Sequence, residues 1–220
     1  MAQYTLVVGT KNWSSWSLRP YVALRATGAA FEEVTIVLRR TERAVTRAEI
    51  LKHSAAGRVP ILKIAEGGKT HVVWDSLAIC ETLAERHPQA HLWPADPFLR
   101  AEARSYACEM HSGFAALREQ LSMEFARRLK PDLTDAAKAD IARVIEAWEH
   151  ALTRHGDEHG FLFGRFSIAD AMYAPVVSRF VTYGVDVPPM VQGYMDRMMA
   201  LPAMQDWGRD SMAEVEAGLA

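Results

Sequence analysis

The chain has 220 residues, of which 50% are hydrophobic and 24% are charged, and its formal net charge is −2. This length suits one large domain or two small ones, and the weak net charge gives no electrostatic reason to expect a nucleic acid or an anionic membrane as partner. No apolar run is long enough to span a bilayer, the N-terminus lacks a signal-peptide pattern, and Cys80 and Cys108 are typical of reduced thiols, so we expect a cytoplasmic protein.

The first third of the chain predicts alternating strands and helices. Residues 3–9 form a short apolar run closed by glycine, and residues 31–38 alternate as a second strand. Between them we expect a helix that begins near Trp16 or Ser17, because Pro20 is harmless only in a first turn. A helix between the two strands makes them parallel. Residues 41–54 predict a further helix.

Residues 57–76 predict a hairpin with a proline at its start and a polar pair at its end. A cis bond between Val59 and Pro60 would turn the Val59 N–H and C=O outward, where an extended peptide could pair with them as an added strand. Asp75 or Ser76 should cap the helix that follows. Asp75 would also bind the ammonium of that peptide, and Ser76 with the helix N-terminus would bind its carboxylate. The stretch therefore predicts a site for a small zwitterionic peptide.

The second half predicts helices alone. Three prolines and no periodicity in residues 87–97 indicate a linker. After it the helical patterns cover residues 98–129, 134–155, 166–183, 189–200 and 202–217. Ser167 and Asp170 have the spacing of a capping box at the start of one of these helices.

The motif V-P-x-L, the hairpin and the following Asp75-Ser76 resemble the glutathione-binding half of the cytosolic glutathione transferases, and the Ser167–Asp170 cap resembles one that recurs in that family. The resemblance covers nearly the whole chain. It implies an α/β thioredoxin-like domain, βαβαββα with a cis-proline, over residues 1–86, a linker over 87–97, and an all-α domain over 98–220. It also implies a homodimer, with glutathione as co-substrate.

Activation of glutathione requires a stabilised thiolate. Lowering a thiol pKa of about 8.5 by two units requires about 2.7 kcal/mol, which one hydrogen bond to the charged sulfur, roughly 1.5–3 kcal/mol, and one helix N-terminus can supply. No metal is required. Residues 14–19 are similar to the zeta-class pattern S-S-C-x-x-R, whose first serine is the activating residue. The resemblance implies that Ser14 stabilises the thiolate, with Ser15 as the next choice. We expect Ser17 to cap the helix.

Trp16 stands where the zeta pattern has cysteine, and this departure puts the maleylacetoacetate isomerase activity of that class in doubt. No cysteine lies anywhere in residues 11–20, which excludes reactions that need a mixed disulfide there. Arg58 is a candidate for the glycyl carboxylate of glutathione. The candidates for the wall of the electrophile pocket are aromatic residues, a histidine and a methionine, most of them on one helical face: Trp13, Tyr106, Met110, His111 and Phe114.

The function that these patterns favour is a glutathione transferase, which activates the thiol of glutathione for attack on a small electrophile. One alternative is a glutathione-dependent isomerase, dehalogenase or peroxidase on the same fold. Another is a non-catalytic binding protein of that fold. The sequence does not identify the physiological electrophile, and it gives no indication of a metal, nucleic acid or membrane partner.

Overall fold

The sheet is built around β1 (Gln3–Gly9), which pairs in parallel with β2 (Phe31–Ile36) and antiparallel with β3 (Ile61–Glu66). β4 (Lys69–Val73) extends the sheet beyond β3, so the strand order is β2-β1-β3-β4. The structure is a computed structural model of the chain and describes residues 2–157 and 159–220. With the helices in between, the order βαβαββα is that of a thioredoxin-like domain, as the sequence predicts.

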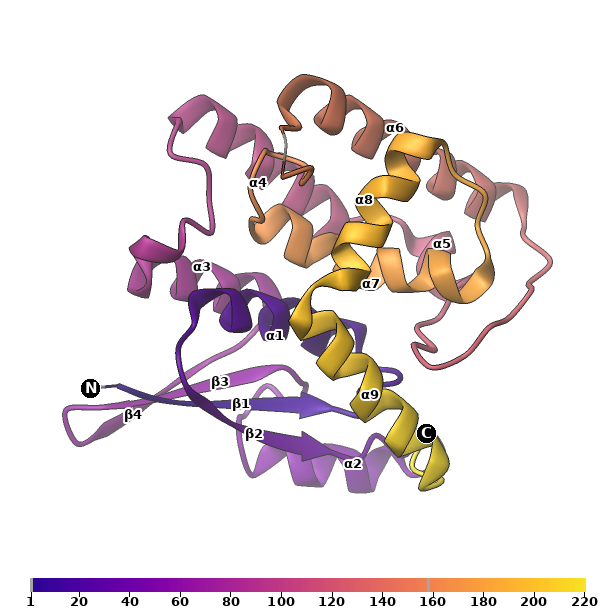
Figure 1. Cartoon of the computed structure of the whole chain (residues 1–220). Coiled ribbons are helices and arrows are strands. Elements are labelled where there is room, and N and C mark those ends of the chain that lie inside the picture. The colour runs from indigo at the N-terminus through magenta and orange to yellow at the C-terminus, as the bar shows by residue number, and fades with distance from the viewer. Residues whose placement is uncertain (1, 158) are drawn as a thin grey trace.

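Helices cover both faces of this sheet (Figure 1). They are α1 (Ser15–Thr27), α2 (Arg43–Leu51) and α3 (Ser76–Arg86). Successive side chains of a strand point to opposite faces, and in β1 Val7 packs with Ile50 of α2 whereas Leu6 joins the large core that includes α1 and α3. Both faces are buried, which explains why β1 reads as a continuous apolar run.

The regular elements of the second half are all helices within the described residues, and α7 and α9 pack on α1 (Figure 1). Its elements are η1 (Pro88–Ala90), α4 (Pro97–Ser112), α5 (Ala115–Gln120), α6 (Asp135–His155), α7 (Ile168–Tyr183), α8 (Pro189–Ala200) and α9 (Pro202–Glu216). Helix α7 is buried along almost its whole length and packs against both α1 and α4, so one continuous core joins the two halves. Within the described residues, no helix combines the length and the apolar character that crossing a membrane requires.

Two predictions about helix ends are wrong. The pattern over residues 98–129 is not one helix, because α4 ends at Ser112, Gly113 is extended, and Phe114 adopts a left-handed conformation with φ of 63° before α5 begins. Helix α1 begins at Ser15, earlier than expected, with Ser14 at the N-cap position. Pro20 therefore lies in the second turn, and Ser17 is a buried first-turn residue rather than the cap.

Two local predictions are confirmed. The peptide bond between Val59 and Pro60 is cis. The capping box at the start of α7 is present: the Ser167 N–H donates to Asp170 over 2.8 Å, and the Leu162 N–H donates to the other carboxylate oxygen over 3.1 Å. Burial raises the pKa of Asp170 to about 6, although these hydrogen bonds favour the charged form.

Candidate functional site

A cleft of about 590 Å³ lies beside the cis-proline and the start of α3. Five predicted glutathione-binding residues line it together: Arg58, Val59, Pro60, Asp75 and Ser76. The fold brings them together because β3 starts directly after Pro60 and the hairpin returns the chain, through β4, to the same end of the sheet. The remaining lining residues are Trp16, Ala56, Trp74 and His111.

The cleft contains both hydrogen-bond donors and hydrogen-bond acceptors that are available to a ligand. Neither the N–H nor the C=O of Val59 has a hydrogen-bond partner in the described structure, so both are available to an added strand. Asp75 is the N-cap of α3 and accepts the Leu77 N–H over 2.8 Å through one carboxylate oxygen, and its other oxygen lies 3.5 Å from His111 Nε2. The Ser76 hydroxyl is buried and has no partner. Arg58 is exposed at the rim and makes no ion pair with a described residue.

His111 joins this cleft from the helical half of the molecule. Its Nε2 lies 3.5 Å from Asp75 Oδ2, and its ring meets the edge of Trp16 at 5.3 Å between centroids. His111 belongs to α4, so one side of the cleft depends on how the two halves pack. It is the one predicted electrophile-pocket residue that lines the cleft.

The three serines before and within α1 differ in their hydrogen bonds. Ser14 is buried, and its hydroxyl donates to Ser17 Oγ over 2.7 Å. Ser17 Oγ also accepts the Gly9 N–H, which ties the start of α1 to the end of β1. The Ser15 hydroxyl makes no hydrogen bond to any described residue. Trp16, in the same turn, lines the cleft, whereas Ser14 and Ser15 are not among its lining residues.

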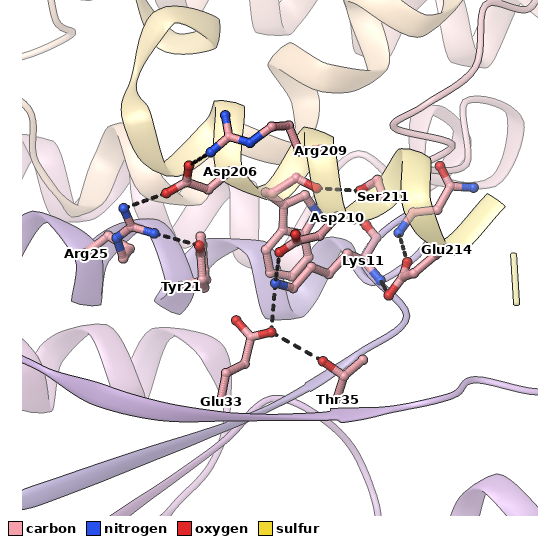
Figure 2. A network of polar contacts seen from close by, with 12 residues as sticks. Lys11, Tyr21, Arg25, Glu33, Thr35, Asp206, Arg209, Asp210, Ser211 and Glu214 are labelled. Atoms are coloured by element: carbon pink, nitrogen blue, oxygen red, sulfur yellow. Dashed lines mark hydrogen bonds and ion pairs between the residues drawn. The ribbon is translucent and has the colours of Figure 1, made fainter. Parts of the chain in front are cut away.

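Helix α9 fixes the loop that precedes Ser14. The Glu214 carboxylate accepts the backbone N–H groups of Lys11 and Asn12, each over 2.9 Å, and the Lys11 ammonium bonds Asp210 and Glu33 (Figure 2). Burial of Lys11 disfavours its charge, but these two acidic partners outweigh that effect and raise its pKa. Burial likewise raises the pKa of Glu214.

A second carboxylate, that of Glu124, holds the same loop from the other side. It accepts the Asn12 side-chain amide over 2.9 Å and the Trp13 indole N–H over 3.2 Å, and it pairs with Arg40. The Arg40 guanidinium stacks on Trp13, 4.0 Å from the ring centroid. The loop that carries Ser14 is therefore held by residues from the C-terminal half of the chain, as a pre-organised site requires.

The other predicted electrophile-pocket residues lie outside the cleft. Trp13 is engaged by Glu124 and Arg40, as described above. Met110 and Phe114 are buried in the core, and Tyr106 packs edge-on against Phe163 and bonds His150 through its hydroxyl. These apolar side chains form the contact between helices, where burial of their surface stabilises the fold.

The sequence analysis did not assign Trp16, Ala56 and Trp74 to the cleft. Trp16 and Trp74 carry a signal that could have placed them there: each is a large aromatic residue two positions or fewer from a predicted polar ligand, Ser14 or Asp75. Trp74 is 54% exposed, which is unusual for tryptophan and typical of a binding surface.

A larger cavity, of about 650 Å³, lies in the helical half between α6, α7 and the segment before α6. Its lining is mostly apolar with a few basic residues, among them Arg128 and Lys138, and it contains none of the predicted site residues. Catalytic chemistry needs convergent polar groups in addition to volume. The cleft beside Val59 and Asp75 is therefore the candidate site.

Comparison with known proteins agrees with this geometry. Residues 13–86 match the family model "Glutathione S-transferase, N-terminal domain", and residues 131–207 match "Glutathione S-transferase, C-terminal domain". A probable maleylacetoacetate isomerase of Caenorhabditis elegans is 27% identical over 177 residues, which cover 80% of this chain and 79% of the relative.

Two solved structures contain bound glutathione. A glutathione transferase homologue from Burkholderia GL BGR1 has a TM-score of 0.71 and 29% identity, and the match covers 96% of this chain and 99% of the other. A maleylacetoacetate isomerase from Anaeromyxobacter dehalogenans 2CP-1, with glutathione in its active site, has a TM-score of 0.70 and 26% identity over 96% of this chain and 98% of the other. Fold, cleft and comparisons together show that this chain belongs to the glutathione S-transferase family.

Proposed function

We propose that the protein is a glutathione transferase that binds glutathione in the cleft and activates its thiol for attack on a small electrophile. In this reaction an electron pair of the thiolate forms the carbon–sulfur bond, and the leaving group departs with the electrons of the bond that breaks. The observation that carries the proposal is the convergence of an unpaired Val59 backbone, a cis-Pro60, and the Asp75–Ser76 helix start in one cleft.

In the proposed complex, glutathione lies along residues 59 and 60 as a short added strand. The Val59 N–H and C=O pair with its cysteinyl residue. Asp75 binds the γ-glutamyl ammonium, while the free Ser76 hydroxyl and the N-terminus of α3 bind the carboxylate beside it. Arg58, at the rim, is the candidate for the glycyl carboxylate. On this proposal residues 1–86 bind glutathione and residues 98–220 cover the electrophile.

Ser14 is the proposed donor to the thiolate. It occupies the N-cap position of α1, so a sulfur beside it also experiences the positive end of that helix. Its hydroxyl now donates to Ser17 and has to turn toward the sulfur when glutathione binds. Ser15 is the alternative, because its hydroxyl is already without a partner in the described structure.

The proposal is tested by assaying conjugation of glutathione to 1-chloro-2,4-dinitrobenzene. If Ser14 supplies most of the 2.7 kcal/mol that thiolate formation requires, Ser14→Ala should lower kcat/KM by up to about 100-fold. Ser15→Ala, the matched neighbouring change, should lower it less than about threefold on the same reasoning. Turnover that survives Ser14→Ala but not Ser15→Ala would transfer the role to Ser15. Absence of turnover by a wild-type protein that binds glutathione would contradict the transferase assignment.

A second candidate function is glutathione-dependent isomerisation, because the relatives named above include maleylacetoacetate isomerases. The same thiolate would then add to a double bond and leave again after rotation, without net consumption of glutathione. Incubation with maleylacetoacetate, with glutathione measured before and after, separates the two reactions: an isomerase forms product at constant glutathione, whereas a transferase consumes one glutathione per product.

We also propose a homodimer, on the family resemblance, which light scattering of the purified protein tests.

A further inference from the structure

One pair of side chains in the cleft joins the two halves of the molecule. His111 lies in the last turn of α4, and its Nε2 is 3.5 Å from Oδ2 of Asp75 at the start of α3. The other carboxylate oxygen of Asp75 accepts the Leu77 N–H and caps α3. Oδ2 is therefore the oxygen that remains for a ligand, and His111 already lies beside it.

The His111 ring can change its charge in this position. Its side chain is 30% exposed and lines the cleft, while its edge-on contact with Trp16 fixes the ring plane. Nδ1 is buried and has no hydrogen-bond partner in the described structure, so Asp75 is the polar group that the ring contacts. Histidine ordinarily gains or loses its proton between about pH 5 and 8. The contact with Asp75 is an ion pair only when His111 carries the proton.

The lining of the cleft supplies one negative charge. Asp75 is the acidic residue among the described lining residues, and Arg58 is a basic one. On α4 itself, the neighbouring Glu109 is already paired with Arg143 over 2.8 Å. A protonated His111 therefore depends on Asp75 for its counter-charge.

The helices that pack around His111 add positive charge. Arg118 of α5 donates to the His111 backbone carbonyl over 3.3 Å. The Arg19 guanidinium of α1 lies 4.2 Å from the centroid of the Trp16 ring, whose edge meets His111. Like charges disfavour the protonated imidazole, and Asp75 opposes them. The proton on His111 is consequently sensitive to whatever else binds to Asp75.

Glutathione brings a second cation to the same carboxylate oxygen. In the proposed complex its ammonium binds Asp75, while its neighbouring carboxylate binds Ser76 and the N-terminus of α3. An ammonium and an imidazolium that share one carboxylate repel each other. Neutral His111 removes this repulsion and leaves Asp75 to the ammonium.

We propose that glutathione binding expels a proton from His111, so that the cleft binds glutathione more weakly as the pH falls and His111 becomes charged. His111 is then a residue of the helical half that controls the γ-glutamyl end of the site. The inference rests on the proposed function, since it requires the ammonium of glutathione at Asp75.

Titration calorimetry with S-methylglutathione tests the inference, because its methylated sulfur has no proton to release. At about pH 6.5 the binding enthalpy of the wild-type protein should differ between MES and Bis-Tris buffers, as release of about half a proton requires. The Kd should rise about fivefold from about pH 7.5 to about pH 5.5, the effect expected of one partly exposed ion pair.

His111→Gln keeps a polar side chain but cannot gain a charge. It should bind S-methylglutathione with nearly the wild-type affinity at about pH 7.5, release no proton, and show a constant Kd down to about pH 5.5. His71→Gln, the same change at an exposed position of β4 outside the cleft, is the matched control and should keep the wild-type pH dependence. Proton release that persists in His111→Gln would overturn the inference.

NMR follows the same event on the ring itself. The imidazole C–H resonance that His111→Gln removes should move toward the position of the neutral form when S-methylglutathione is added to the wild-type protein at about pH 6.5. Binding without proton release, or with an unmoved resonance, would overturn the inference and leave the proposed function in place. Failure of both S-methylglutathione and glutathione to bind at either end of the pH range would overturn both.

Discussion

The cleft beside Val59 and a set of three arginines in the helices, Arg19, Arg118 and Arg179, which we call the guanidinium cluster, are built in opposite ways. The cleft takes most of its lining from two short stretches, residues 56–60 and 74–76, and offers a backbone edge and a helix start. The cluster takes one residue from each of three helices that are far apart in the sequence, and guanidinium nitrogens of Arg19 and Arg179 are buried without a hydrogen-bond partner.

The two regions differ in their cost to folding. The cleft uses backbone N–H and C=O groups and the N-terminus of a helix, which are present in the fold whether or not a ligand binds. It therefore adds little to the free-energy cost of folding. The cluster instead buries charge: Arg19 lies over the Trp16 ring, 4.2 Å from its centroid, and Arg179 has two guanidinium nitrogens without a hydrogen-bond partner, so we expect it to cost stability.

The largest expected effect is on stability and tests the cost assigned to the cluster. Arg179→Met should raise the unfolding free energy by roughly 1–4 kcal/mol, because it removes a buried charge without a partner and keeps an unbranched apolar side chain. Urea unfolding measures this. Arg154→Met should change stability by less than about 1 kcal/mol, since its ion pair is exposed. Destabilisation by Arg179→Met would mean that the charge is satisfied in the folded protein.

The next effect tests the cleft. Asp75→Ala should weaken glutathione binding by about 1.5–3 kcal/mol, or roughly 10- to 150-fold in Kd, because the ammonium loses its charged partner. Titration calorimetry measures the change. Asp96→Ala is the matched control, since Asp96 caps α4 through the N–H groups of Phe98 and Leu99 but does not line the cleft. Both variants lose a helix cap, so an equal loss of affinity would show that the effect comes from the cap alone.

Asp170 is a buried ionisable group that has hydrogen-bond partners, the N–H groups of Leu162 and Ser167. Its effect on stability can be compared with that of the buried arginines. Because burial raises its pKa from 3.8 to about 6, the folded protein binds a proton between these values that the unfolded chain has released. This group's contribution to stability should therefore fall by roughly 2–3 kcal/mol as the pH rises from about 4 to 6. Asp170→Asn should flatten that slope in urea unfolding measured across the range. An unchanged slope would show that Asp170 stays ionised throughout.

The smallest expected effect concerns the loop before Ser14. Glu214→Ala leaves the Lys11 and Asn12 N–H groups without their acceptor and should lower the unfolding free energy by about 1–2 kcal/mol. Because this loop positions Ser14, kcat should fall more than the affinity for glutathione. Glu216→Ala, an exposed change on the same helix, should leave both near wild type. Equal effects of the two substitutions would remove α9 from any role in positioning the site.

The sequence predicts the cleft better than it predicts the guanidinium cluster. The thioredoxin-like order, the cis-proline and the Asp75–Ser76 helix start are confirmed, because each depends on residues close together in the chain. The cluster could not be predicted in the same way. Arg19, Arg118 and Arg179 look like ordinary helix residues, and only tertiary packing buries Arg19 and Arg179 and places Arg19 and Arg118 over the Trp16 ring.

The errors also come from packing. The periodicity of residues 98–129 continues across Gly113 and Phe114, and only their backbone conformations reveal that the chain turns there. Tyr106 and Met110 share a helical face as predicted, but that face contacts other helices rather than the cleft. A stripe of apolar residues shows which side of a helix is buried, but it does not show which neighbour covers that side.

The central claim is that Ser14 and the start of α1 stabilise the glutathione thiolate, and its most direct test is a pH titration of bound glutathione by the ultraviolet absorbance of the thiolate. The account predicts a thiol pKa about two units below the ordinary value of about 8.5 in the wild-type protein. It also predicts that Ser14→Ala returns most of this shift while Ser15→Ala does not. A thiol that titrates near its free value in the wild-type complex, or an unchanged shift in Ser14→Ala, would contradict it.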